Sequence, residues 1–335
     1  MKHVVRLLGL LISAFCIWLI ARVFRPAALL AGLQHAHPLW LAPAALTLAG
    51  FLTLNAWRWR TLLRPAATLP LFRLLRWQLI GYLGNTIFPF RAGEVARVVL
   101  VARNSSVRPA PVIATIVVEK ICDGSALVGL LLLSLLLLPV PGWVTVVAAI
   151  GAAAFACGIA LLLALSTPAC TSLLQRQRFS GLPGKLHGLL LSALTMVPGP
   201  RSLALLLGQS LLLWLVDVLN TACVLQVFAL PVGLPGALLL TAGLNLAQIV
   251  PAGPAAIGTY EATILALLSS MGIATAPAQL AALGLRAAQY APPALLGLLA
   301  VWWEGLSLQE LRRPAPVDQA TEAELRRGAA SAGRL

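Results

Sequence analysis

The sequence has too little charge to cover the surface of a water-soluble protein. Charged residues make up 10% of its 335 residues, whereas soluble domains carry about 25%. Hydrophobic residues make up 60% of the chain, and the mean hydropathy is +0.92. The composition therefore predicts an all-α, polytopic helical membrane protein and excludes a soluble domain of useful size.

Several motifs that carry chemistry are also lacking. The five cysteines form no CxxC pair, and no phosphate-binding GxxxxGK[ST] loop occurs. No histidine has metal-ligand spacing to a second ligand; the four are His3, His35, His37 and His187. We therefore expect no metal, no cofactor and no ATP-driven step, and we do not expect an enzyme.

Apolar runs of about 20 residues, the length that crosses a bilayer, predict about six spans. The predicted runs are Val4–Phe24, Leu39–Leu63, two within Ile121–Ser166, Leu203–Leu230 and Ala278–Trp303. The first run lacks a good cleavage site, so we interpret it as a retained signal anchor. Residues 1–306 are expected to form the membrane domain, and 307–335 a polar, disordered cytoplasmic tail.

The net charge is +14, but the basic residues lie in short clusters between apolar runs. Such clusters mark the cytoplasmic ends of spans, so both termini are predicted to be cytoplasmic and nucleic acid is not an expected partner. Arg58 and Arg60, which alternate with Trp57 and Trp59, are interpreted as a basic cytoplasmic flank of the second span.

Two apolar segments, 72–90 and 237–272, are interrupted by proline, glycine and polar residues. Each runs Asn, apolar, Pro, Gly, Glu, from Asn85 to Glu94 and from Asn245 to Glu261. Broken backbone at membrane depth is tolerated where it is buried in protein or lines a wet cavity. The pair therefore suggests re-entrant helices in an inverted repeat around a midplane site; two ordinary loops are the alternative.

Charged side chains near these breaks are candidate functional groups. Arg91 and Arg97 follow the first break, where helix N-termini favour anions such as phosphate. Glu119 and Asp123 are four residues apart and share one helix face. They are either functional carboxylates or an ion-paired interfacial cap. Asp217, at the centre of a span, is either functional or a structural partner of Arg286.

At these residues the chain resembles the flippase-like family named for the transmembrane half of lysyl-phosphatidylglycerol synthase. The shared patterns are Asn55-x-x-Arg58-Trp59, Gly81-x-x-x-Asn85-x-x-x-Pro89-x-Arg91-x-Gly93-Glu94-x-x-Arg97, Glu119-Lys120-x-x-Asp123 and Pro251-x-x-Pro254-x-x-x-Gly258-x-x-Glu261. Three positions depart from the family: Lys120 stands for arginine, Ala255-Ala256 for two glycines, and Tyr260 for a frequent arginine.

The resemblance implies a bacterial-type inner-membrane flippase for an anionic, aminoacylated, glycosylated or polyprenyl-linked lipid. Lysyl transfer is not implied, since that activity belongs to a separate soluble domain. The residues expected to contact the lipid headgroup are Asn85, Arg91, Glu94, Arg97, Glu119, Asp123, Asn245 and Glu261. Two alternatives stay open. One is a membrane-embedded lipid-carrier transferase with Glu119 and Asp123 as general acid and base. The other is a non-catalytic partner of a lipid or glycan biosynthetic enzyme.

Overall fold

The computed structural model describes residues 36–88, 92–105, 107–140, 142–165, 172, 199–248 and 256–305. Within these ranges every regular element is a helix, which confirms the predicted fold class. The predicted first span, most of the basic loop before residue 201, and the tail 307–335 lie outside the described residues, as do Arg91 and the prolines of both breaks.

Within the described ranges, four segments are long and apolar enough to cross a bilayer. They are the short 3-10 helix η1 (Pro38–Trp40) with α3 (Leu41–Leu63), α6 (Pro109–Leu137), α7 (Gly142–Leu165) and α10 (Pro200–Val227). The predicted last span forms α13 (Thr275–Trp303), which is equally long but contains Arg286 and two prolines and is not among these four.

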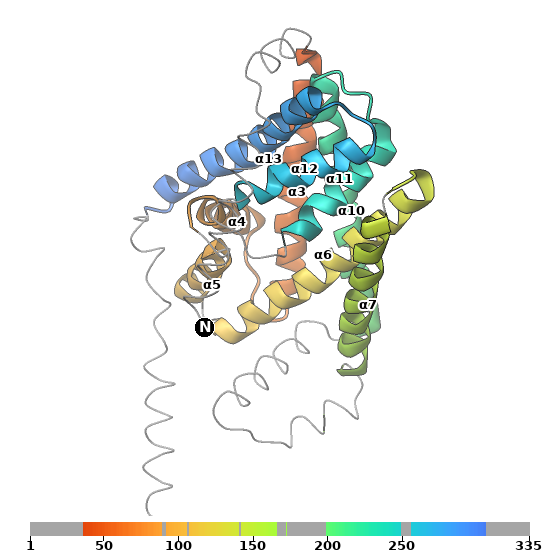
Figure 1. The fold of residues 1–335 in the computed structure, drawn as a ribbon. Helices are drawn as coiled ribbons and strands as arrows, with labels where there is room; N and C mark the ends of the chain where they lie inside the picture. The colour runs from red at the N-terminus through yellow and green to blue at the C-terminus, as the bar shows by residue number, and fades with distance from the viewer. Residues whose placement is uncertain are drawn as a thin grey trace, which may run out of the picture.

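Four other helices of the described chain are short and occur as two pairs. The first pair is α4 (Leu71–Ile87) and α5 (Ala92–Asn104), and the second is α11 (Gly233–Ala247) and α12 (Thr259–Ser270). Even the longest, α4, extends only about 25 Å at 1.5 Å per residue, less than the roughly 30 Å of hydrocarbon. Each pair packs as a hairpin, so both interrupted segments are broken helices, as the sequence suggested (Figure 1).

The order long, short, short, long occurs twice, first in α3 to α6 and again in α10 to α13. The packing is consistent with two-fold symmetry between the repeats: α3 packs on α10, α4 packs on α13, and α6 packs on α11. Thus the second helix of each repeat lies against the fourth helix of the other. Helix α7 stands between the repeats in sequence and packs on α6 (Figure 1).

The two repeats run in opposite directions. Asn220 of α10 donates a 2.7 Å hydrogen bond to the carbonyl oxygen of Ala44, near the start of α3. Arg58, near the end of α3, donates a 2.7 Å bond to Oγ of Ser210, earlier in α10. The equivalent helices α3 and α10 are therefore antiparallel, and the repeat is inverted, as predicted.

Glycine contacts draw α4 and α5 together. A Cβ on Gly84 would lie 2.8 Å from the Cα of Gly93, and a Cβ on Gly93 would overlap the carbonyl oxygen of Gly81. Small residues allow such close approach between helices in membranes. The glycines in this part of the shared sequence pattern, from Gly81 to Gly93, thus allow the two helices of the first hairpin to pack closely.

Candidate functional site: a cavity between the repeats

A cavity of about 670 Å³ lies between the repeats and is lined by side chains from both. Its apolar wall includes Leu48, Phe51, Leu52, Phe155 and Leu213. Its polar wall includes six carboxamides and two phenols: Asn55, Gln78, Asn85, Asn245, Gln248, Gln289, Tyr82 and Tyr290. One chamber therefore offers an apolar surface and a hydrogen-bonding surface to the same occupant.

Most of the side chains predicted from the sequence to form a site meet in this cavity. Six line it: Asn85, Glu94, Arg97, Glu119, Asp123 and Asn245. Glu261 is not among the lining residues, and Arg91 lies outside the described residues. Residues separated by up to 160 positions are thus brought to one chamber by the folding of the two repeats.

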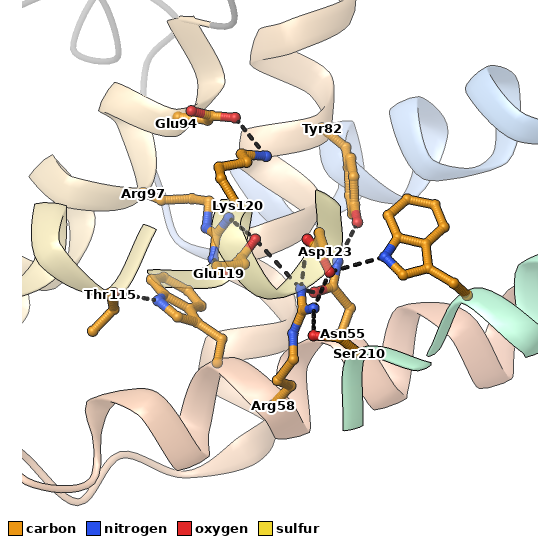
Figure 2. Close-up of polar contacts among 12 residues, drawn as sticks. Asn55, Arg58, Tyr82, Glu94, Arg97, Thr115, Glu119, Lys120, Asp123 and Ser210 are labelled. Atoms are coloured by element: carbon orange, nitrogen blue, oxygen red, sulfur yellow. Dashed lines mark hydrogen bonds and ion pairs between the residues drawn. The ribbon is translucent and has the colours of Figure 1, made fainter. Parts of the chain in front are cut away.

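Arg58 is the centre of a buried polar network, and its side chain is 1% exposed. Its guanidinium donates to both carboxylate oxygens of Asp123, and to Asn55 Oδ1 at 3.0 Å and Ser210 Oγ at 2.7 Å. Trp214 Nε1 donates to the same Asp123 carboxylate at 2.9 Å. Figure 2 shows these contacts from three helices converging on one guanidinium. The planar fork of arginine suits this bidentate geometry.

A second arginine extends the network. Arg97 donates to the two oxygens of Glu119 at 3.2 Å and 2.9 Å, and its guanidinium lies 4.1 Å from the ring centroid of Trp59. Glu119 also lies 3.7 Å from Arg58 Nη2, so it bridges both arginines (Figure 2). All four charges are buried, and the two cations balance the two carboxylates.

Two predictions for these residues need correction. Glu119 and Asp123 do share one face, but the interfacial cap is wrong, because α6 begins at Pro109 and buries both within the helix. Arg58 is not a cytoplasmic flank. It lies on the buried face of α3 beside Trp59 and Leu62, whereas Arg60 is exposed. The helical spacing of Asn55, Arg58 and Trp59 was the available signal for this burial.

A third ion pair lies at a more exposed part of the cavity wall. Lys120 Nζ is 2.9 Å from Glu94, and the side chains are 42% and 24% exposed. The second repeat has its own pair, Arg286 with Glu261, and Glu261 also accepts a 2.8 Å bond from the backbone N–H of Gly258. Gly258 has φ +90°, a left-handed conformation that glycine adopts without strain.

The two asparagines of the breaks also have local structural partners. Asn85 Oδ1 accepts a 2.9 Å bond from the backbone N–H of Gly93 and so ties the end of α4 to the start of α5. Asn245 Nδ2 donates a 2.9 Å bond to the carbonyl oxygen of Thr241 one turn earlier. Both therefore support the shape of the chamber as well as lining it.

The chemistry available in the chamber is hydrogen bonding among balanced charges. The cations of the described residues that line or border it are already ion-paired, so an anionic group could engage Arg97 only in competition with Glu119. Gln78 is 2% exposed and lines the cavity, and neither of its amide atoms has a hydrogen-bond partner in the described chain. Within the described ranges no group of three His, Cys, Asp or Glu side chains is placed to hold a metal.

A comparison with known proteins shows which family this architecture belongs to. The model of one family, described as the lysylphosphatidylglycerol synthase TM region, matches residues 6–297. The chain belongs to this family. The match covers the first repeat, the second repeat except the last residues of α13, and every residue that lines the cavity. In this member of the lysylphosphatidylglycerol synthase TM family, the first shared pattern builds the Arg58 network, and the second builds the α4–α5 hairpin.

The family member also resembles one curated protein at a distance. It is 25% identical over 319 residues to a protein named glycosyltransferase AglD of Haloferax volcanii. The alignment covers 84% of this chain and 51% of that protein, so the chain spans about half the length of the relative it matches. The family name and the name of this relative both refer to proteins of lipid and glycan metabolism. The chain is a multi-pass membrane protein that is similar to such proteins.

Proposed function

We propose that this protein moves a lipid between the two leaflets of a bacterial-type inner membrane, with the lipid headgroup passing through the cavity between the repeats. The observation that carries the proposal is the composition of that cavity, which joins a wall of charged and carboxamide groups to an apolar wall. Inverted repeats with broken helices around such a site are the architecture of many secondary transporters.

Physical chemistry favours a lipid as the occupant. A polar headgroup that enters hydrocarbon loses its hydrogen bonds to water. The free-energy cost is about 2–7 kcal/mol for each unsatisfied group. Asn55, Gln78 and Gln289 can replace those bonds at membrane depth. The volume of about 670 Å³ falls within the range of small-molecule sites, roughly 300–1,000 Å³, and suits a headgroup rather than an entire lipid.

The proposed headgroup contacts are Asn85, Glu94, Arg97, Glu119, Asp123 and Asn245. Arg97 would engage a phosphate or other anion, and the carboxylates would engage an amine. Carboxamides and phenols would bind the hydroxyl groups of a glycosylated headgroup. The apolar wall near Leu48 and Phe51 would contact the first part of an acyl or polyprenyl chain.

The test is reconstitution of the purified protein into liposomes that contain a trace of phosphatidylglycerol carrying a fluorescent label. A membrane-impermeant quencher added outside bleaches only the outer leaflet, so the bleached fraction measures lipid movement. The variants are Arg97→Ala and Glu119→Gln, which remove the two partners of one buried pair. The matched control is Glu304→Gln, whose carboxylate pairs with Arg76 outside the cavity lining.

We expect wild type and Glu304→Gln to bleach well beyond half of the label, and both cavity variants to approach the half that protein-free liposomes give. Repeating the assay with a labelled aminoacylated and a labelled glycosylated lipid ranks the headgroup classes. If no lipid of the three classes moves faster with wild type than without protein, the flippase proposal is wrong.

A second candidate follows from the relative named as a glycosyltransferase, of which this chain matches about half. The chain could serve as the membrane module that presents a lipid carrier to a separate glycosylating enzyme. Stoichiometric co-purification of such an enzyme, together with glycolipid formation that needs this chain, would favour that role. Lipid movement by the purified protein alone would favour the flippase.

A further inference from the structure

Asp217 differs from every other carboxylate that the structure describes. Five of these six side chains have a cationic partner: Glu94 with Lys120, Glu119 with Arg97, Asp123 with Arg58, Glu261 with Arg286, and Glu304 with Arg76. Asp217 has no ion pair or hydrogen bond with any part of the chain that is described. The structural pair with Arg286 that the sequence left open is not formed, because Arg286 binds Glu261 instead.

The carboxylate lies at membrane depth and on the cavity wall. Asp217 stands in the interior of α10, a 28-residue span, and is 6% exposed. It is a lining residue of the same chamber as Arg97 and Asp123. One turn before it, Trp214 donates to Asp123, and one turn after it, Thr221 contacts Thr241 at 2.9 Å. Its helix thus connects the Arg58 network to α11.

Among the described residues, the buried faces of the helices packed on α10 offer Asp217 no uncommitted cation. The ionisable side chains of the helices packed on α10 are Arg58 and Arg60 on α3, Glu119, Lys120, Cys122 and Asp123 on α6, and Arg286 and Tyr290 on α13, while His37 lies by η1 at the far end of α10. Lys120 pairs with Glu94, and Arg60 is exposed. Arg58 and Arg286 are each held in an ion pair with another carboxylate. Tyr260 donates to Gln289, and α11 contributes no ionisable group.

Among the described residues, the four ion pairs around the chamber balance one to one, so the net charge that these residues give the chamber is the charge of Asp217. Burying an unpaired charge is costly, and a group in that position is neutralised by binding a proton. With the proton bound, the chamber is neutral and hydrogen-bonding; with the proton released, it carries one negative charge. An anionic headgroup is accepted by the first state and repelled by the second.

We propose that Asp217 is the proton-binding site of the cavity and that a proton enters and leaves together with the lipid headgroup. The proton is taken from water on the side to which the cavity is open and is released to water on the other side. The coupling rests on the proposed lipid movement, whereas proton binding by Asp217 does not.

The proton site is tested without any lipid substrate. Infrared difference spectra of the purified protein in nanodiscs of phosphatidylcholine are recorded between acidic and alkaline pH. Wild type should show the carbonyl band of a protonated carboxylic acid that titrates away as the pH rises. Asp217→Asn should lose the band, Asp217→Glu should keep it at a shifted position, and Glu304→Gln should leave it unchanged. If Asp217→Asn does not fold, the shift in Asp217→Glu alone identifies the band.

Coupling is then tested in liposomes with labelled phosphatidylglycerol and an imposed pH gradient. The gradient should speed net lipid movement by wild type at least several-fold and leave Asp217→Asn insensitive. A response to a Na⁺ gradient at equal pH, with no response to pH, would overturn the proton in favour of Na⁺. A titrating band with no lipid movement would contradict the proposed function and the coupling. A missing band, or one retained in Asp217→Asn, would overturn the proton site itself.

Discussion

Glu94 and Glu261 occupy the same place in the two repeats. Helix α5 begins at Ala92 and α12 begins at Thr259, so each glutamate is the third residue of the second short helix. A negatively charged glutamate in the first turn interacts favourably with the positive end of the helix dipole. Both therefore stabilise the start of the helix that follows a break.

Their cationic partners correspond as well. Helix α6 begins at Pro109 and α13 at Thr275, so Lys120 and Arg286 are each the twelfth residue of the closing long helix. Each binds the glutamate of its own repeat. The repeat is thus preserved in the position of an ion pair even where the identity of the cation differs.

We predict that the two pairs contribute unequally to stability. Glu94→Gln should lower the free energy of unfolding by less than about 1 kcal/mol, since its pair is partly exposed. Glu261→Gln should cost about 1.5–3 kcal/mol, because the more buried carboxylate also accepts the Gly258 N–H bond. Thermal unfolding in detergent measures both, and equal shifts in Tm would contradict the prediction.

The buried pair of Arg97 and Glu119 should show strong non-additivity. Removing one partner leaves an uncompensated buried charge, which costs about 3–5 kcal/mol. Arg97→Met should therefore unfold at a markedly lower temperature than wild type. The double variant Arg97→Met/Glu119→Gln should recover part of that loss, because no net charge then stays beside the Arg58 and Asp123 pair.

A double-mutant cycle on unfolding temperatures checks this coupling. Additive effects of the two substitutions would mean that the 2.9 Å contact contributes nothing to the folded state. Lipid movement is measured on the same samples. A double variant that is stable but inactive would separate the structural role of the pair from its proposed headgroup role.

Gly93→Ala should disrupt the first hairpin. Its new Cβ would overlap the carbonyl oxygen of Gly81, which is backbone and cannot turn away. The matched control is Gly208→Ala in α10, where a Cβ meets nothing within 4 Å. Glycine to alanine at such an open helical site is neutral or stabilising by up to about 1 kcal/mol. Unfolding temperatures should therefore move in different directions, and a tolerated Gly93→Ala would contradict the close contact of α4 with α5.

Much of the architecture could be predicted from the sequence, because membrane-spanning helices are visible as long apolar runs. Leu39–Leu63 and Leu203–Leu230 were predicted to within a few residues of their helices. The start of α6 was missed, because the twelve residues before Ile121 include two prolines, Glu119 and Lys120 and are less apolar than the run that follows. Arg108 and Pro109, a helix-starting pair, were the local signal for the true beginning.

The site was only partly predictable, since ion-pair partners are set by tertiary packing. Spacing placed Glu119 and Asp123 on one face, but nothing local pointed from either to Arg58, which is 61 or more residues earlier. Charge counting favoured an exposed Arg58, whereas the fold buries it. The broken segments were found because proline and glycine are visible in sequence, while the partner of each glutamate was not.

The inverted repeat predicts opposite orientations for α3 and α10. The backbone N–H of His37, before α3, donates a 2.7 Å bond to the carbonyl oxygen of Val227 at the end of α10, so these two ends lie on one side of the membrane. Single cysteines are placed in a cysteine-free background at Leu39, Leu234 and Arg201, which are all exposed. In whole cells with both termini cytoplasmic, an impermeant maleimide should label Leu39→Cys and Leu234→Cys, whereas Arg201→Cys should react only after the cells are broken.

The three positions form their own control, because Leu39 and Leu234 begin different repeat elements but must behave alike. The reverse pattern, with only Arg201→Cys labelled in whole cells, would keep the inverted repeat and overturn the cytoplasmic termini. Labelling of Leu39→Cys and Arg201→Cys from one side, with Leu234→Cys reacting from the other, would contradict the antiparallel packing of α3 and α10. In that case the two breaks could not face one chamber from opposite leaflets, and alternating access through it would be excluded on geometric grounds.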